Sequence, residues 1–218
     1  MRVQAVGCKK GAAVIELLNV DCMEYMKTCK DKEFDLAVVD PPYGIGASEM
    51  QMGLGKKNWS KGKKWDSEAP SQEYFNELMR VSKNQIIWGG NYFQLPIQRG
   101  WIFWDKDIPD GLSFSDGELA WTNFDKVLRK VFIPYSGFRG SDGNKIHPTQ
   151  KPVKLYNWIY QNYAEPKQRI LDTHLGSGSS AISAYYFDMD FVGCEIDKEY
   201  FEATQKRFKE VTAQTKLF

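Results

Sequence analysis

Residues 34–46 read FDLAVVDPPYGIG, an apolar run followed directly by a carboxylate, two prolines and an aromatic ring. The run at 34–39 has the length and β-branched content of a buried parallel strand. Asp40 and the residues after it are therefore expected at the carboxyl end of a strand, the edge at which open α/β sheets bind ligands. A plain strand followed by a Pro-Pro turn with a capping Asp is the structural alternative for this segment.

Each residue of this turn has a chemical use at such an edge. Asp40 supplies an acceptor that can polarise an amine. Pro41 and Pro42 lack an N–H and have a fixed φ, so they hold a stiff turn with outward-facing carbonyls. Tyr43 offers a flat face on which a planar substrate can stack. The segment therefore predicts a site for a planar amine.

Length and composition favour a globular protein that forms one domain over residues 1–218. Aromatic residues make up 14% of the chain, which argues against disorder. The formal charge of +1 means that any nucleic-acid surface must be a local patch. Four cysteines without a CxxC pair, and only two histidines, indicate reduced thiols in a cytoplasmic protein and argue against a zinc site. We expect neither a signal peptide nor a membrane span, because the chain has no long apolar segment.

Strand and helix patterns alternate along the chain, which indicates an α/β sheet with crossover connections. The expected strands are 13–17, 34–39, 84–90, 101–104, 118–121, 169–172 and 190–196. The expected helices are 22–30, 71–83, 151–164, 179–187 and 198–212. The short spacing between 101–104 and 118–121 favours an antiparallel pair at the edge of the sheet.

A second turn with chemical content is DTHLGSGSS at 172–180, between an expected strand and helix. Gly176 and Gly178 permit a tight turn and close approach of a ligand to the backbone. Glu195 ends the next apolar strand, at the spacing of an acidic partner for ribose hydroxyls. The fingerprint GxGxxG is incomplete, because Ala181 stands at its last position, and a plain strand–turn–helix would use these glycines too. If strands 34–39 and 169–172 are neighbours, a nucleoside and a planar amine would share one crevice.

Three segments together carry a family resemblance: DPPYGIG at 40–46, HPTQKP at 147–152 and DTHLGSGSS at 172–180. They resemble, in that order, the motifs of the beta-group amino-methylating DNA methyltransferases, and most of all the compact adenine methylases of phages and mobile elements. Supporting blocks are IIWGGNYF at 86–93, FSDGELAW at 114–121 and GCEIDKEYF at 193–201. The chain departs from many members at Thr173-His174, where they have Pro-Phe, and no large separate target-recognition domain is visible.

The resemblance implies a Rossmann-like fold with a seven-stranded, mostly parallel sheet and a reversed edge strand. It also implies S-adenosylmethionine as the methyl donor and a flipped-out adenine in double-stranded DNA as the acceptor, in a bacterial or phage-encoded protein. The catalytic residues would be Asp40, Pro41, Pro42 and Tyr43. The cofactor-binding residues would be Asp21, Cys22, Lys151, Asp172, Thr173, Gly176, Ser177, Gly178, Ser179 and Glu195. A homodimer and a cognate restriction enzyme are plausible partners from the resemblance, although no residue pattern here indicates either.

Two loops, 44–69 and 134–150, are candidates for contact with DNA. The first carries a run of lysines with interleaved tryptophans, which can bind phosphates and stack on bases. Its DNA-binding candidates are Lys56, Lys57, Trp59, Lys61, Lys63 and Lys64. A solvated flexible loop is the structural alternative. A weaker second group comprises Arg129, Lys130, Arg139 and Lys145.

Three other functions remain open. Methylation of the cytosine N4 amine would use the same fold and site. Methylation of an RNA or protein amide is disfavoured by Asp40 and by the order of the motifs. A catalytically silent DNA-binding or cofactor-sensing module is disfavoured because Asp40, Tyr43 and both glycines are present.

Overall fold

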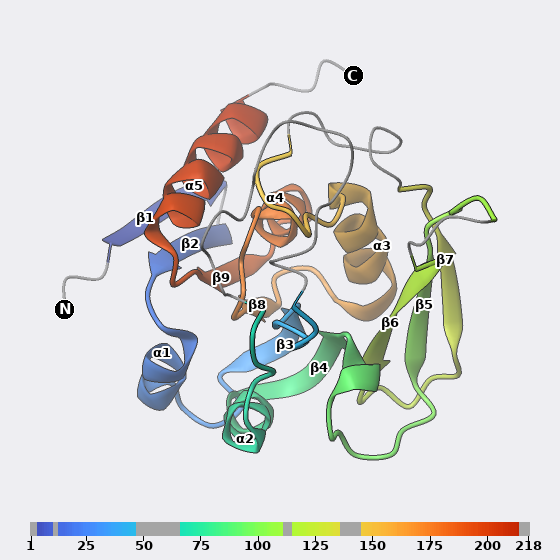
Figure 1. Cartoon of the computed structure of the whole chain (residues 1–218). Coiled ribbons are helices and arrows are strands. Elements are labelled where there is room, and N and C mark those ends of the chain that lie inside the picture. The colour runs from blue at the N-terminus through green and yellow to red at the C-terminus, as the bar shows by residue number, and fades with distance from the viewer. Residues whose placement is uncertain (1–3, 11–12, 47–65, 111–114, 136–144, 214–218) are drawn as a thin grey trace.

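The computed structural model describes residues 4–10, 13–46, 66–110, 115–135 and 145–213. Within these ranges the chain forms one sheet flanked by helices (Figure 1). The strands are β1 (Gln4–Lys10), β2 (Ala13–Asn19), β3 (Phe34–Val39), β4 (Ser82–Trp88), β5 (Trp101–Asp105), β6 (Gly117–Thr122), β7 (Arg129–Phe132), β8 (Arg169–Asp172) and β9 (Asp190–Cys194). The helices are α1 (Cys22–Thr28), α2 (Gln72–Val81), α3 (Val153–Tyr163), α4 (Ser179–Tyr186) and α5 (Lys198–Ala213), with a short 3₁₀ turn η1 (Gly90–Tyr92).

The described strands form a sheet in the order β1-β2-β9-β8-β3-β4-β6-β5-β7. Five adjacent strands, β2, β9, β8, β3 and β4, run parallel to one another. Strand β6 is antiparallel to both β4 and β5. The expected antiparallel pairing of the segments at 101–104 and 118–121 is therefore confirmed. Strands β3 and β8 are direct neighbours, with Leu36 paired to Ile170, as the shared crevice requires.

The sheet has nine strands rather than the expected seven, because β1 pairs with β2 and β7 pairs with β5. Neither segment has the apolar run that marks a buried strand. In β7 only Val131 is buried, and the other three residues are exposed. Because of β7, the antiparallel pair does not end the sheet, and the reversed strand at an outer edge is β1.

Helices cover both faces of the sheet (Figure 1). Helices α3, α4 and α5 lie on one face, and α1 and α2 lie on the other. Strand β3 supplies both interfaces, because alternate side chains of a strand point to opposite faces. Leu36 and Val38 belong to the hydrophobic cluster under α3 and α4, whereas Ala37 and Val39 belong to the cluster under α2. This burial on both faces explains the unbroken apolar run at 34–39.

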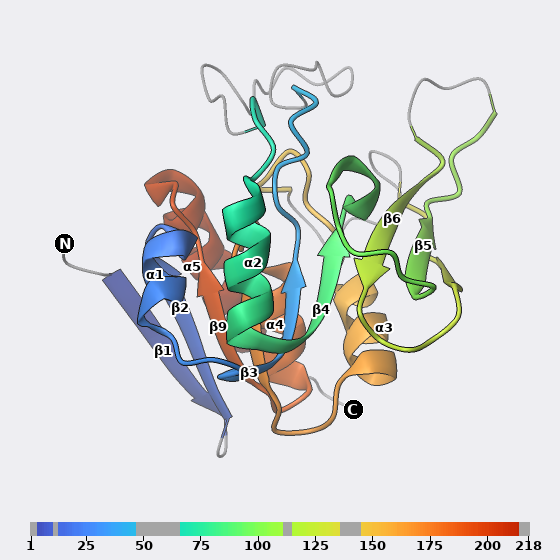
Figure 2. The same cartoon turned by 90° about the horizontal axis from the view of Figure 1, so that it is seen from below.

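The parallel strands bring their carboxyl ends to one edge of the sheet, as the arrows of β3 and β4 show in Figure 2. Asp40 follows β3, and Gly89 follows β4. The glycine turn at 172–178 follows β8, and Glu195 follows β9. Residues distant in sequence therefore meet at this edge. Across the described ranges, no helix combines the length and the apolar character needed to cross a membrane.

Ile170→Ala tests the packing at the centre of the sheet. Ile170 is fully buried between the neighbouring strands β3 and β9, so truncation leaves a cavity. We expect the free energy of unfolding to fall by about 2–5 kcal/mol in urea denaturation. The exposed Lys206→Ala on α5 serves as the control and should change stability by less than about 0.5 kcal/mol. A loss below about 1 kcal/mol for Ile170→Ala would contradict the packing described here.

Candidate active site

Two cavities open at the carboxyl edge of the sheet and share one wall. The first has a volume of about 250 Å³ and the second of about 520 Å³. Residues that line both are Asp40, Pro42, Thr149 and Lys151. The structure thus brings the turn after β3 and the segment before α3 together between the two cavities. The glycine turn after β8 lines the first cavity alone.

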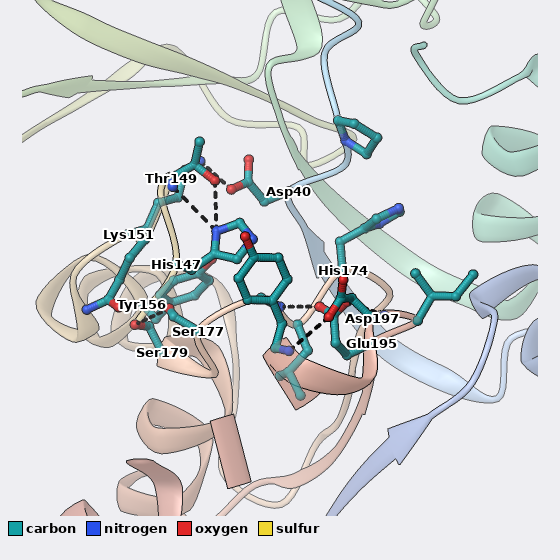
Figure 3. Close-up of a pocket in the computed structure, with 16 residues that line it drawn as sticks. Asp40, His147, Thr149, Lys151, Tyr156, His174, Ser177, Ser179, Glu195 and Asp197 are labelled. Atoms are coloured by element: carbon teal, nitrogen blue, oxygen red, sulfur yellow. Dashed lines mark hydrogen bonds and ion pairs between the residues drawn. The ribbon is translucent and has the colours of Figure 1, made fainter. Parts of the chain in front are cut away.

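The first cavity contains part of the predicted cofactor site. Figure 3 shows Asp40 and Thr149 on one side of it and Glu195 and Asp197 on another. Of the residues predicted for the cofactor, those that line it are Lys151, Gly176, Ser177, Ser179 and Glu195. Lining residues that the sequence did not single out for this role are His147, Thr149, Gln150, Tyr156, His174, Leu175, Ile196, Asp197 and Tyr200.

The glycine turn is held by α5 and by Glu195. Gly178 has a φ of +72°, and a Cβ there would lie 2.6 Å from Thr204 Cγ2, so only glycine fits without a shift. The Thr204 hydroxyl donates to the Gly176 carbonyl. The Glu195 carboxylate accepts from the backbone N–H groups of Gly176 and Asp197, each at 2.9 Å. The turn therefore has a fixed shape before any ligand binds.

Arg207 of α5 is a structural residue of this turn that the sequence did not reveal. Its buried guanidinium donates to the Ser177 carbonyl at 2.6 Å and to the Ser179 hydroxyl at 3.0 Å. Helical periodicity assigns the residue to a charged helix but does not indicate what it contacts.

The remaining residues predicted for the cofactor lie outside the lining of the first cavity. Asp172 supports the turn from behind, because its carboxylate accepts from His174 N at 3.0 Å and from the Ser180 hydroxyl at 2.5 Å. The Thr173 hydroxyl lies 2.6 Å from the Tyr74 hydroxyl. Asp21 caps α1 by accepting from Met23 N at 2.7 Å. Direct contacts of Asp21, Cys22, Asp172, Thr173 and Gly178 with a cofactor stay predictions.

Burial changes the pKa of three side chains in and behind the first cavity. It raises the pKa of Asp172 to about 7 and that of Glu195 to about 7, because the charged forms lose solvation. It lowers the pKa of His174 to about 4, so this imidazole is neutral near pH 7. Of the two carboxyl groups only that of Glu195 lines the first cavity, whereas Asp172 lies behind its turn.

The second cavity is built around Tyr43. The Tyr43 ring stacks on Tyr92 with the centroids 5.1 Å apart and the planes 15° from parallel. Gly89 makes room for this ring, because a Cβ at that position would lie 2.2 Å from Tyr43 Cε1. Further lining residues include Pro41, Ile45, Asp66, Asn91, Phe103, Lys106, Asp116, Glu118 and Leu119. An aromatic wall beside a group of charged residues suits a flat, polar ligand.

Asp66 fixes the turn that carries Tyr43. It is 1% exposed, and its side chain accepts from the backbone N–H groups of Tyr43 at 2.6 Å and Gly44 at 3.0 Å. Its own carbonyl accepts from Gly46 N at 3.1 Å. The turn thus has defined hydrogen-bond partners where the two prolines supply no donors.

A charged cluster of Asp40, Tyr43, Lys106, Glu118 and Lys151 lies where the cavities meet. The Lys151 ammonium contacts Asp40 Oδ2 at 2.5 Å and Glu118 Oε2 at 2.9 Å. Lys106 pairs with the other oxygen of Glu118. The Tyr43 hydroxyl donates to Asp40 Oδ1 at 2.8 Å. Lys151, which the sequence predicts as a cofactor neighbour, lines both cavities, and its charged end contacts the carboxylate predicted to be catalytic.

The two carboxylates of the charged cluster differ in protonation. Burial favours the neutral form of Glu118, but the ammonium groups of Lys151 and Lys106 outweigh it and lower the pKa of Glu118 to about 2. For Asp40, burial raises the pKa, and the negative charge of Glu118 acts in the same direction against the opposing effect of Lys151. The pKa values of the two carboxylates are therefore shifted in opposite directions, upward for Asp40 and downward for Glu118.

Comparison with known proteins finds DNA methyltransferases similar in sequence to this chain. A family model described as DNA methylase matches residues 101–206. Type II methyltransferase M2.MboI of Moraxella bovis is 23% identical over 244 residues, which cover 88% of this chain and 86% of that protein. Type II methyltransferase M.HinfI of Haemophilus influenzae is 22% identical over 245 residues, which cover 89% and 68%. This chain is a relative of the amino-methylating DNA methyltransferases.

Solved structures confirm the fold of this methyltransferase relative. An M1.HpyAVI–SAM complex superposes with a TM-score of 0.57 at 20% identity and covers 88% of this chain and 98% of that one. PvuII DNA methyltransferase, described as cytosine-N4-specific, superposes with a TM-score of 0.58 at 14% identity and covers 90% and 89%. The predicted Rossmann-like methyltransferase fold is therefore confirmed.

The lysine-rich candidates for DNA contact lie outside the described residues. These are Lys56, Lys57, Trp59, Lys61, Lys63 and Lys64. In the weaker group, Arg139 also lies outside them, and Lys130 pairs with Asp105 at 2.7 Å.

Asp172→Asn tests the titration behind the glycine turn. A raised pKa means that the folded chain holds the Asp172 proton more tightly than the unfolded chain. The stability this contributes is full below the ordinary pKa of 3.8 and is lost as the pH rises through about 7. Because an Asn side chain carries no charge and the Ser180 hydroxyl can reverse its hydrogen bond, the variant should escape this loss.

We expect Asp172→Asn to be more stable than the wild type at about pH 8 by on the order of 2 kcal/mol, with the gain shrinking toward about pH 4. Urea denaturation across this range measures it. The exposed Asp125→Asn is the control and should show no such trend. Parallel pH dependences of the wild type and Asp172→Asn would contradict the raised pKa.

Proposed function

We propose that this chain transfers a methyl group from S-adenosylmethionine to the N6 amine of an adenine flipped out of double-stranded DNA. The observation that carries the proposal is the meeting of two cavities at Asp40. One cavity lies against a glycine turn with an acidic partner, and the other lies against an aromatic wall. Two substrates that bind one to each cavity would have their reacting atoms close to the same carboxylate.

The residues of the first cavity fit S-adenosylmethionine. A Cβ on Gly176 would meet nothing closer than 3.8 Å, so the turn leaves open space for a ligand to approach its backbone. Each Glu195 oxygen accepts one backbone N–H and can also accept from a ribose hydroxyl. Gln150 lines the cavity, and its buried Nε2 has no hydrogen-bond partner in the described structure, so it offers a donor. The cofactor, when bound, supplies an electrophilic methyl group whose bond to sulfur breaks with the electron pair left on sulfur.

Asp40 and the turn after it would activate the target amine. The exocyclic amine of adenine is a weak nucleophile, because its lone pair is delocalised into the ring. The Asp40 carboxylate and the Pro41 carbonyl would accept its two hydrogens and favour a tetrahedral nitrogen. Asp40 would also stabilise the positive charge that develops as the nitrogen–carbon bond forms, and accept the proton that the nitrogen then loses.

The second cavity would receive the base. A target amine inside a duplex is out of reach, so the nucleotide must leave the stack. Tyr92 occupies one face of the Tyr43 ring, so a base that stacks on Tyr43 uses the opposite face or takes the place of Tyr92. The lysines of residues 56–64, which follow the Tyr43 turn in the sequence, would bind phosphates of the DNA.

Adenine is favoured over cytosine by the residue at position 40. Asp at this position resembles the adenine branch of the family, whereas Ser is typical of the branch that methylates cytosine N4. Because the family includes methylases of both amines, cytosine N4 is the second candidate product. A silent binding module is disfavoured, because Asp40 is present in the charged cluster and lines both cavities.

Nucleoside mass spectrometry on unmethylated DNA incubated with the protein and S-adenosylmethionine tests the reaction. We expect N6-methyladenine from the wild type. In Asp40→Ala we expect the single-turnover rate to fall by at least about 10²-fold, because the acceptor for the amine is lost. The exposed Asp125→Ala is the matched control and should keep the wild-type rate.

As a control for folding, calorimetry measures whether Asp40→Ala still binds S-adenosylmethionine. Methylated cytosine N4 would keep the mechanism and change the base. Full activity in a folded Asp40→Ala protein would refute the role of Asp40.

A further inference from the structure

Glu118 is a buried carboxylate of the second cavity that the sequence did not single out. It projects from β6, the antiparallel strand, toward the turn after β3. One oxygen lies 2.9 Å from the Lys151 ammonium, and the other pairs with Lys106. The Tyr43 hydroxyl, which bonds to Asp40, is also within 3.3 Å of Glu118. Glu118 thus contacts Lys151 and Tyr43, the two side chains that also contact Asp40.

The charged cluster pairs oppositely charged side chains at a site that has little contact with solvent. The side chain of Lys151 is 4% exposed, and those of Asp40 and Glu118 are 18% and 22% exposed. Two carboxylates face two ammonium groups, so the cluster is neutral when Asp40 is ionised. Burial makes each charge depend on its partners, because an unpaired ion in such a site is costly.

Lys151 is shared between the two carboxylates. Its ammonium also lies over the Trp88 ring, 5.3 Å from the centroid, which limits its movement. An ammonium that paired with Asp40 alone would occupy the carboxylate that must accept the hydrogens of the target amine. Glu118 offers a second acceptor at 2.9 Å, and so draws part of the ammonium charge away from Asp40.

We propose that Glu118 is a positioning residue that acts through Lys151, sharing the ammonium with Asp40 so that the Asp40 carboxylate is left free to accept the target amine. The role of Glu118 in the reaction rests on the proposed methyl transfer. Its effect on Lys151 rests on the geometry of the charged cluster. In the proposed methyl transfer, Glu118 contacts no reacting atom.

The direction of the effect follows from the groups that face Asp40. They are Lys151 before α3, Glu118 on β6, Tyr43 on the same turn and, further away, Asp172 at the end of β8 and Tyr156 on α3. If the Glu118 charge is removed, the Lys151 ammonium pairs with Asp40 alone, which lowers the pKa of Asp40. Removing the Lys106 charge strengthens the hold of Glu118 on Lys151 and raises the pKa of Asp40.

The test compares Glu118→Gln with the matched variant Lys106→Met. Carboxyl ¹³C NMR, with Asp40 assigned through Asp40→Asn, follows the titration without any need for turnover. Single-turnover methylation at saturating S-adenosylmethionine follows the rate as a function of pH. Calorimetry measures the affinity for the cofactor in each variant.

For Glu118→Gln we expect the Asp40 titration and the acidic limb of the rate to move to lower pH. The plateau rate should fall by about 10–100-fold, and the cofactor affinity should stay within about threefold. For Lys106→Met we expect both titrations to move to higher pH. Glu118→Asp, which keeps the charge, should restore the position of the limb. General damage to the fold would not shift the acidic limbs of Glu118→Gln and Lys106→Met in opposite directions.

Unchanged titrations and rates in Glu118→Gln would overturn the inference, as would shifts in the same direction for both variants. If the wild type methylates no DNA while the Asp40 titration moves in opposite directions in the two variants, the proposed function fails and the coupling of Glu118 to Asp40 stands. If the wild type methylates DNA and Glu118→Gln equals it, the function stands and this inference fails.

Discussion

The ion pair between Lys151 and Asp40 joins two segments that lie 111 residues apart in the chain. Asp40 is delivered by β3 and Lys151 by the segment that leads into α3, so the pair forms only if the sheet and its covering helix are both in place. Its burial makes the geometry demanding, because each charge relies on the other in the absence of water. The wall between the two cavities is built on this contact.

The division of labour between the cavities follows from strand direction. Parallel strands β3, β8 and β9 end at one edge and deliver a carboxylate, a glycine turn and an acidic partner side by side. The antiparallel strand β6 enters the same edge from the opposite direction and begins there, so its second residue, Glu118, lies close to the turn after β3. One reversed strand thus contributes a side chain that a wholly parallel sheet would not place there.

The sequence predicted the elements whose information is local. The apolar run at 34–39 and the glycines of the second turn carry their own signals. The pairing of β3 with β8 was only a condition for the shared crevice, and it is the structure that shows it. Glu118 and Arg207 were missed, because their importance arises from contacts across the fold. Gly89 was seen only as the end of a strand, and its contact with Tyr43 depends on the rotation of that ring. Strand β7 was missed because its residues are mostly exposed and show no alternating pattern.

The hydrogen bonds of Asp66 affect how the sequence of such a protein can evolve. It binds Tyr43 N and Gly44 N through its side chain, and Gly46 N through its carbonyl, so both ends of the segment between residues 46 and 66 are joined by hydrogen bonds. The entropy of closing a loop grows only slowly with its length once its ends are held. Replacement or lengthening of the intervening residues therefore need not disturb the turn that carries Asp40. Changes in the sequence of that segment can therefore accumulate independently of the turn that precedes it, with Asp66 as the boundary between them.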